Sequence, residues 1–223
     1  MSIRSNLDKL LETIPAHVKL VAVSKTKPER DILEAYDAGQ RIFGENKVQD
    51  LTAKQAVLPA DIDWHFIGHM QRNKVKYIAP FIGLIHGVDS LKLLKEVNKQ
   101  AVKHNRIIDC LLQFHIAEET TKFGLSIEEA TDLLKNPEYH SMKNIRFTGV
   151  MGMSTFTDDY ELVRKEFKTL KSIFDRLKGE FFKSEDHFKE ISMGMSGDYQ
   201  IAIEEGSTMV RIGTSIFGER NYP

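Results

Sequence analysis

The sequence has a single cysteine, no strong excess of either charge and no long hydrophobic run. One cysteine excludes an internal disulfide and fits a reducing compartment, so we expect a cytoplasmic protein. The 31 basic and 32 acidic residues give a formal net charge of −1. The protein therefore has no net positive charge that would attract nucleic acid or an anionic membrane. No segment is apolar enough to cross a bilayer, so we expect no membrane partner.

Two further patterns exclude common kinds of chemistry. Cys110 lies within the apolar run 107–112, and no basic residue beside it would stabilise a thiolate, so we expect a buried strand residue rather than a reactive thiol. His65 and His69 suggest a pair of metal ligands, but no third ligand stands at a recognisable spacing and the His-Glu-x-x-His motif is absent. We therefore expect no metal site.

Short apolar runs alternate with helical patterns along the chain. Most runs are apolar at consecutive positions, which is typical of parallel strands covered on both faces. The predicted strands are residues 18–24, 41–44, 63–67, 83–87, 107–116, 145–151, 187–192 and 208–212. Eight strand–helix units in 223 residues favour an α/β fold, a single closed (β/α)8 TIM barrel. An open doubly wound sheet is the alternative, but no glycine-rich dinucleotide motif follows the first strand.

The chain has no obvious linker, repeat or low-complexity tract, so residues 1–223 are expected to form a single barrel domain. Residues 1–17 carry apolar positions at helical spacing, which predicts an amphipathic N-terminal helix packed on the barrel. Ser126 followed by Glu129 predicts a capping box. Thr157 or Asp158 is expected to begin the longest helix, which ends near Gly179.

Polar residues concentrate at the C-terminal ends of the predicted strands, where barrels place their chemistry. Residues 21, 23 and 25 share one strand face, so Lys25 points into the barrel mouth if the two valines point inward. Loss of water there would favour the neutral amine, which is the form that attacks aldehydes. Glu45 and Asn46, after the second strand, either orient a ligand or cap the following helix.

Arg211 shares a face with Met209 and is also expected to point inward, where a guanidinium needs a ligand acceptor or an internal carboxylate. The loops after strands seven and eight are a recurrent phosphate site in barrels, and here they hold residues 193–197 and the pair Gly213-Thr214. The first loop leads into a helix near Asp198, and backbone N–H groups at a helix start attract anions. An amine beside an anion site is what a pyridoxal phosphate (PLP) pocket requires.

Five segments carry a resemblance to a known family. They are residues 22–28 (AVSKTKP), 43–46 (FGEN), 64–69 (WHFIGH), 192–196 (SMGMS) and 206–214 (GSTMVRIGT). With them, the whole chain resembles the pyridoxal phosphate homeostasis protein family, a single-domain relative of the alanine racemase N-terminal barrel. The resemblance implies that pyridoxal 5'-phosphate is the cofactor and that Lys25 forms the internal aldimine with it. It further implies cofactor-binding roles for Asn46, which lines the pocket, for Arg211, which faces the pyridine nitrogen, and for Ser196, Gly213 and Thr214, which hold the phosphate.

Arg211 favours cofactor binding without turnover. A guanidinium can only donate hydrogen bonds, so the pyridine nitrogen would stay unprotonated and the ring would be a weak electron sink. The chain ends at Pro223, just after the eighth strand, so no second domain is expected to supply the tyrosine base of the racemase. We therefore expect no catalytic residue, and a monomeric homeostasis protein that holds PLP and passes it to PLP-dependent apo-enzymes.

Two alternatives remain open at this point. One is a low-activity PLP-dependent amino-acid racemase or lyase that uses Lys25 as its only base. The other discards PLP and makes Lys25 the Schiff-base lysine of an aldolase-like barrel that acts on a sugar phosphate.

Overall fold

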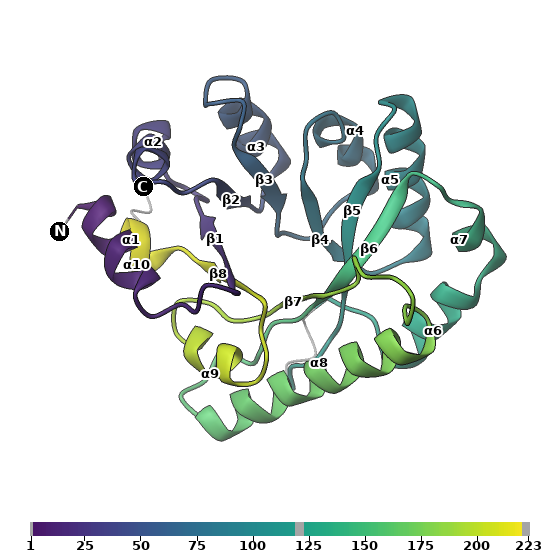
Figure 1. Ribbon diagram of the computed structural model, residues 1–223. Helices are drawn as coiled ribbons and strands as arrows, with labels where there is room; N and C mark the ends of the chain where they lie inside the picture. The colour runs from purple at the N-terminus through teal and green to yellow at the C-terminus, as the bar shows by residue number, and fades with distance from the viewer. Residues whose placement is uncertain (1, 119–122, 220–223) are drawn as a thin grey trace.

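The computed structural model describes residues 2–118 and 123–219. Eight parallel strands form a closed barrel, in which each strand pairs with its sequence neighbours and β1 closes the ring against β8 (Figure 1). The strands are β1 (Lys19–Val23), β2 (Ile42–Glu45), β3 (Asp63–Phe66), β4 (Leu84–Val88), β5 (Ile108–Gln113), β6 (Ile145–Met151), β7 (Glu190–Ser192) and β8 (Met209–Ile212). The predicted (β/α)8 barrel is confirmed, and the open-sheet alternative is wrong.

Helices surround the barrel. They are α1 (Ile3–Leu11), α2 (Glu29–Asp37), α3 (Val48–Gln55), the 3-10 turn η1 (Arg72–Lys74), α4 (Val75–Ile78), α5 (Leu91–Lys103), α6 (Ile127–Lys135), α7 (Pro137–Ser141), α8 (Tyr160–Glu180), α9 (Tyr199–Glu204) and α10 (Thr214–Phe217). The N-terminal helix α1 is shorter than the predicted residues 1–17. It buries Leu7 and Leu10 where it packs beside α2 and α10 (Figure 1). In the described parts of the chain no helix is both long and apolar enough to span a membrane.

Side chains alternate between two layers of the core. Val21 belongs to a small cluster inside the barrel, together with residues of β4, β5, β6 and β8. Its neighbours Leu20 and Ala22 belong to the larger cluster between the strands and the helices. The inward direction expected for position 21 is therefore confirmed, and the same alternation directs the residue at position 25 toward the mouth.

Local capping signals set the helix boundaries. The predicted capping box forms, since Ser126 Oγ accepts the N–H of Glu129 and the Glu129 carboxylate accepts the N–H of Ser126. The helix predicted to start at Thr157 or Asp158 is α8, which begins at Tyr160 because Asp159 is its cap and accepts two N–H groups of the first turn at 3.1 Å each. The helix ends at Glu180, one residue beyond Gly179.

Two predicted strands exceed the observed ones by three residues or more, whereas the bounds of the other six lie within one residue of the prediction. The first of these two predicted strands, residues 107–116, is longer than β5, which ends at Gln113 because the next residues pair with the segment at Leu125. His115 N–H donates to the Leu125 carbonyl at 3.2 Å. The run 187–192 contains Phe188, which is buried against Phe182 with ring centroids 4.0 Å apart rather than in the sheet. Each predicted run therefore contains the observed strand but extends beyond it.

The single cysteine behaves as the sequence predicts. Cys110 lies in β5 and is fully buried. Burial, with a smaller contribution from the Asp109 carboxylate, raises the pKa of its thiol well above the ordinary value. A buried thiol of this kind is unreactive at neutral pH.

Candidate functional site

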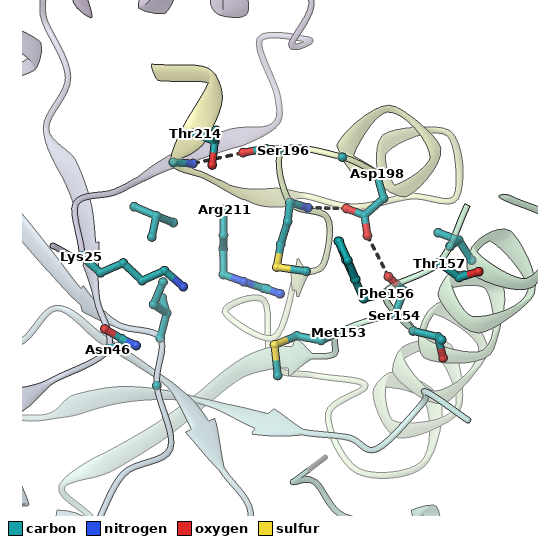
Figure 2. A pocket seen from close by; sticks show the side chains of 18 of the residues that line it. Lys25, Asn46, Met153, Ser154, Phe156, Thr157, Ser196, Asp198, Arg211 and Thr214 are labelled. Atoms are coloured by element: carbon teal, nitrogen blue, oxygen red, sulfur yellow. Dashed lines mark hydrogen bonds between the residues drawn. The ribbon is translucent and has the colours of Figure 1, made fainter. Parts of the chain in front are cut away.

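A cavity of about 630 Å³ opens where the barrel strands end. Its walls come from the segments that follow β1, β2, β3, β6, β7 and β8. All six residues predicted to bind the cofactor line it: Lys25, Asn46, Ser196, Arg211, Gly213 and Thr214. In Figure 2 the side chains of Lys25 and Arg211 extend into the same space, and Ser196 and Thr214 lie together above them. The structure thus brings together residues that the sequence separates by almost the whole chain.

The backbone conformation next to Lys25 gives the side chains of Lys25 and Lys27 different surroundings. Thr26 has a φ of 64°, a left-handed conformation that β-branched residues rarely adopt. Lys27, on its far side, donates from Nζ to the carbonyls of Phe217, Gly218 and Glu219 at 2.8–3.2 Å. The Lys27 ammonium is therefore used to hold the end of α10, whereas the Lys25 side chain reaches into the cavity (Figure 2).

Arg211 is buried at the floor of the cavity and is held by neutral acceptors. Its Nη1 donates to the Ser192 carbonyl at 2.8 Å and to Ser192 Oγ at 2.5 Å, and its Nη2 donates to the Gly152 carbonyl at 3.1 Å. Burial lowers the pKa of Arg211 to about 10, against the opposing effect of the Asp198 carboxylate. The sequence anticipated a ligand acceptor or an internal carboxylate, and the protein partners are instead carbonyls and one hydroxyl.

The loops after β7 and β8 form a cradle of amide groups. Gly213 N–H donates to Ser196 Oγ at 3.4 Å, which joins the two loops. The N–H groups of Ser196, Gly197 and Thr214 have no hydrogen-bond partner within residues 2–118 and 123–219. A Cβ at Gly213 would lie 3.0 Å from the Val23 carbonyl oxygen, so a larger residue there would require the end of β1 to shift. Unpaired amide groups beside two hydroxyls are suited to bind the oxygens of a phosphate.

Asp198 fixes the shape of this cradle. Its Oδ1 accepts the N–H of Met195 at 2.5 Å, and its Oδ2 accepts the hydroxyl of Ser154 at 2.7 Å (Figure 2). The first bond closes the turn between β7 and α9, and the second joins that turn to the loop after β6. Since both carboxylate oxygens are engaged, Asp198 acts as a structural brace of the pocket.

Glu45 does not cap α3, so that expectation is wrong, and its side chain does not line the cavity, whereas Asn46 does. It is fully buried and accepts bonds at 2.6 Å from Lys54 Nζ and from Ser24 Oγ. Burial raises the pKa of Glu45, and the Lys54 ammonium opposes that rise. Glu45 directly precedes Asn46, and Ser24, which binds Glu45 through its hydroxyl and Lys54 through its carbonyl, directly precedes Lys25. The ion pair therefore fixes the backbone before both cavity residues. The cap position of α3 falls instead on Lys47.

The histidines considered as metal ligands take other roles. His65 is buried and its Nδ1 lies 3.0 Å from His86 Nε2, a contact that sequence spacing does not indicate. His69 lies at the cavity wall, stacked on Phe123 with centroids 3.9 Å apart and 3.4 Å from Asp89. Within the described residues no group of three or more His, Cys, Asp or Glu side chains is arranged to hold a metal ion.

The segment after β6 covers the side of the cavity opposite Lys25. Met153, Thr155 and Phe156 line this side, and Figure 2 places Met153 and Phe156 across the space from Lys25. Glu166 of α8 holds the segment, since its carboxylate accepts the N–H and the hydroxyl of Thr155 at 2.7 Å and the N–H of Glu118 at 3.0 Å. Sequence reasoning missed Glu166, because a glutamate within a helix reads as a solvated surface charge.

The residues present fit a phosphorylated aromatic aldehyde with a ring nitrogen. The Lys25 amine matches the aldehyde, the amide cradle matches the phosphate, and the Arg211 guanidinium matches an acceptor nitrogen. The fit uses the amide groups that lack a protein partner and the residues that the sequence predicted.

Comparison with known proteins agrees with this geometry. Residues 1–221 match the family described as alanine racemase, N-terminal domain. The chain is 40% identical over 206 residues to a pyridoxal phosphate homeostasis protein of Aquifex aeolicus, covering 92% of this chain and 88% of that protein. The protein of the same name from Escherichia coli strain K12 is 36% identical over 212 residues, covering 93% and 88%.

Solved structures show the same relationship. PipY of Synechococcus elongatus, solved with PLP bound, is 32% identical with a TM-score of 0.87 and covers 97% of this chain and 100% of that one. An alanine racemase of Bartonella henselae with covalently bound pyridoxal phosphate is 18% identical with a TM-score of 0.71. The match covers 98% of this chain and 58% of the racemase, and it shows that the two share the barrel fold.

Proposed function

Because this chain belongs to the family of the alanine racemase N-terminal domain, we propose that it is a PLP-binding protein of PLP homeostasis, which holds the cofactor and releases it. The observation that carries this proposal is the meeting of the Lys25 amine, the Arg211 guanidinium and the amide cradle in one cavity. Full-length relatives named for PLP homeostasis, and PipY solved with PLP bound, support it.

Each residue of the site has a defined task in this proposal. PLP supplies an aldehyde and an electron-withdrawing ring when it is bound. Lys25 Nζ is the amine that captures the aldehyde, and Asn46 lines the wall beside it. The amide groups of the cradle hold the phosphate together with the hydroxyls of Ser196 and Thr214, and Arg211 faces the ring nitrogen.

The charge state of Arg211 supports holding rather than turnover. With a pKa of about 10 the guanidinium stays protonated at neutral pH, so it donates to the ring nitrogen and cannot deliver a proton to it. Enzymes that use PLP as an electron sink favour a protonated ring nitrogen, which a carboxylate maintains. Asp198 is the carboxylate of the cavity wall whose charge acts on Arg211, and both of its oxygens are engaged in hydrogen bonds to the loops.

The wider setting forms part of the same proposal. We place all of residues 1–223 in one PLP-binding domain, because cavity residues from early and late in the sequence meet at one end of a single closed barrel. The one buried cysteine suits the cytoplasm. A monomer that hands PLP to PLP-dependent apo-enzymes is the simplest form of a holding protein whose cavity opens at the surface.

Titration with PLP, followed by absorbance, tests the proposal. The protein is expected to bind one equivalent, and an absorption band of the bound cofactor distinguishes it from the aldolase-like alternative. A screen of amino acids in deuterated buffer then tests turnover. Robust exchange of the α-hydrogen, lost in Lys25→Ala, would show that the protein is a racemase or lyase and would contradict the holding role.

A further inference from the structure

A chain of polar side chains crosses the interior of the barrel below the cavity. It begins at Arg211 Nη1, which lies 2.5 Å from Ser192 Oγ. Ser192 Oγ lies 3.0 Å from His86 Nδ1, and His86 Nε2 lies 3.0 Å from His65 Nδ1. His65 Nε2 lies 3.4 Å from Asp63 Oδ2, at the first residue of β3. The chain therefore runs from the end of β8 and β7, across to β4, and out at the start of β3.

The strand register places these groups inside the barrel. His86 shares a strand face with Leu84, which belongs to the inner cluster. The outer cluster contains Trp64 and Phe66, so His65 points inward between them. Ser192 and His86 are each 0% exposed, whereas the Asp63 side chain is 50% exposed. The chain thus connects the buried guanidinium to a carboxylate in contact with solvent at the far end of the barrel.

The hydrogen atoms along this series take one direction when Asp63 is ionised and both imidazoles are neutral. The Asp63 carboxylate can only accept, so His65 donates from Nε2–H and accepts at Nδ1 from His86 Nε2–H. His86 Nδ1 is then an acceptor, and Ser192 Oγ donates to it while accepting from Arg211. Burial lowers the pKa of His86 well below its usual value, and the bond from His65 lowers the pKa of Asp63. A neutral imidazole and an ionised carboxylate are the states that this direction requires.

The hydrogen-bonded series of side chains fixes which N–H groups of Arg211 remain available toward the cavity. Three of its five N–H groups are used on Ser192 and Gly152, and Nε–H and the second Nη2–H have no partner within the described residues. Among the described residues no carboxylate forms an ion pair with the guanidinium, whose protein acceptors are two carbonyls and one hydroxyl. We propose that Ser192 and His86 are positioning residues, which hold Arg211 as a directed donor toward the ring nitrogen of bound PLP. This inference rests on the proposed function.

The test compares two ligands on matched variants. One ligand is PLP, and the other is its carbocyclic analogue, in which C–H replaces the ring nitrogen. Ser192→Ala removes the hydroxyl of the chain, His86→Leu removes the imidazole, and His86→Asn restores an acceptor near the position of Nδ1. Thr148→Val is the control, because it removes a buried hydroxyl of β6 that has no hydrogen-bond partner among the described residues. Thermal unfolding of each PLP-free protein establishes that it is folded.

The expected result is specific to the ring nitrogen. Ser192→Ala and His86→Leu are expected to weaken PLP about tenfold, in line with a disturbed bond to a charged group, and to change the affinity of the analogue less than about twofold. His86→Asn should recover part of the loss, and Thr148→Val should match the wild type with both ligands.

Two results would overturn the inference while leaving the proposed function in place. One is an equal loss for PLP and the analogue, which indicates a structural role only. The other is wild-type affinity for PLP in the folded Ser192→Ala protein. This second result would be decisive even if the His86→Leu protein did not fold. Failure of the wild type itself to bind PLP would instead contradict the proposed function and the inference together.

Discussion

At the scale of single residues, the direction of the chain beside the cavity depends on Thr26. Its φ of 64° turns the backbone between the end of β1 and α2, so that Lys25 and Lys27 have different surroundings. The side chain of Thr26 is exposed, so burial does not compensate for the strain. The conformation is instead held by its neighbours, through the bond from Lys27 N–H to the Ser24 carbonyl at 3.0 Å.

Replacing Thr26 by glycine and by alanine tests this strain. Both variants remove the side chain, but only glycine adopts a positive φ without cost, so Thr26→Gly should be more stable than Thr26→Ala by about 1 kcal/mol. At ordinary positions the order is reversed, because glycine loses more entropy on folding. Urea unfolding gives the two free energies, and an alanine variant as stable as the glycine variant would show that Thr26 is not strained.

The buried ion pair behind the cavity makes a second prediction. Lys54→Met leaves the Glu45 carboxylate buried without its cation, and Glu45 Oε2 already lacks a hydrogen-bond partner within the described residues. The free energy of unfolding should fall by about 3–5 kcal/mol. Adding Glu45→Gln to Lys54→Met should recover part of the loss, because the double variant buries no charge. Denaturant unfolding checks both, and a loss below about 1 kcal/mol in Lys54→Met would contradict this assignment.

The hydroxyls of the amide cradle carry a third prediction. Ser196→Ala and Thr214→Val should each weaken PLP binding by about 1–3 kcal/mol, as expected when a bond to a charged group is lost. Ser215→Ala is the matched control, since this hydroxyl belongs to the same helix α10 but does not line the cavity. Equilibrium titration by absorbance measures the three affinities. Unchanged affinity in both cradle variants would place the phosphate elsewhere.

At the scale of elements, the barrel strands supply fixed positions and the segment after β6 supplies a removable wall. The strands are buried and paired on both sides, whereas the wall of residues 153–158 is a loop whose bonds include those of Thr155 to Glu166 and of Ser154 to Asp198. Phe156 of this segment is 95% exposed. A wall with few buried contacts is the part of such a site that opens most readily.

Glu166→Gln tests whether this wall controls cofactor release. Glutamine has one acceptor oxygen in place of two, so the bonds to Thr155 and Glu118 cannot all persist. The rate of PLP dissociation is expected to rise several-fold, with a loss of about 1–3 kcal/mol in stability. Glu161→Gln, at an exposed position of the same helix, should leave the rate unchanged. A dissociation rate in Glu166→Gln equal to that of the wild type would show that the wall does not limit release.

At the scale of the whole molecule, the features that could be predicted from the sequence are those that depend on residues close to one another in the chain. Consecutive apolar residues predict buried parallel strands, and Ser126 with Glu129 predicts a helix start, because both depend on neighbours in sequence. The ends of β1 and β8 were also predictable, since barrel topology places them side by side, and the pairing of Val21 with Arg211 confirms it. The six cavity residues follow from that closure together with the family resemblance.

The interior polar contacts lie beyond what a single sequence shows. Glu45 binds Lys54 from a following helix, and His86 meets Ser192 across the barrel, between strands that are not neighbours in the sheet. A charged or aromatic polar residue in an apolar run shows that a partner is needed without identifying it. The ends of β5 were mispredicted for a related reason, because the pairing with Leu125 depends on a distant segment.

The most direct test of the account is the position at which PLP becomes attached. The PLP-loaded protein is reduced with borohydride, digested and examined by mass spectrometry, with Lys25→Ala and Lys47→Ala treated in parallel. One phosphopyridoxyl group on Lys25 is the predicted result, present in Lys47→Ala and absent from Lys25→Ala. Attachment at Lys27, or equal labelling of the Lys25→Ala protein, would contradict the claim that the Lys25 amine and the phosphate cradle form a single site.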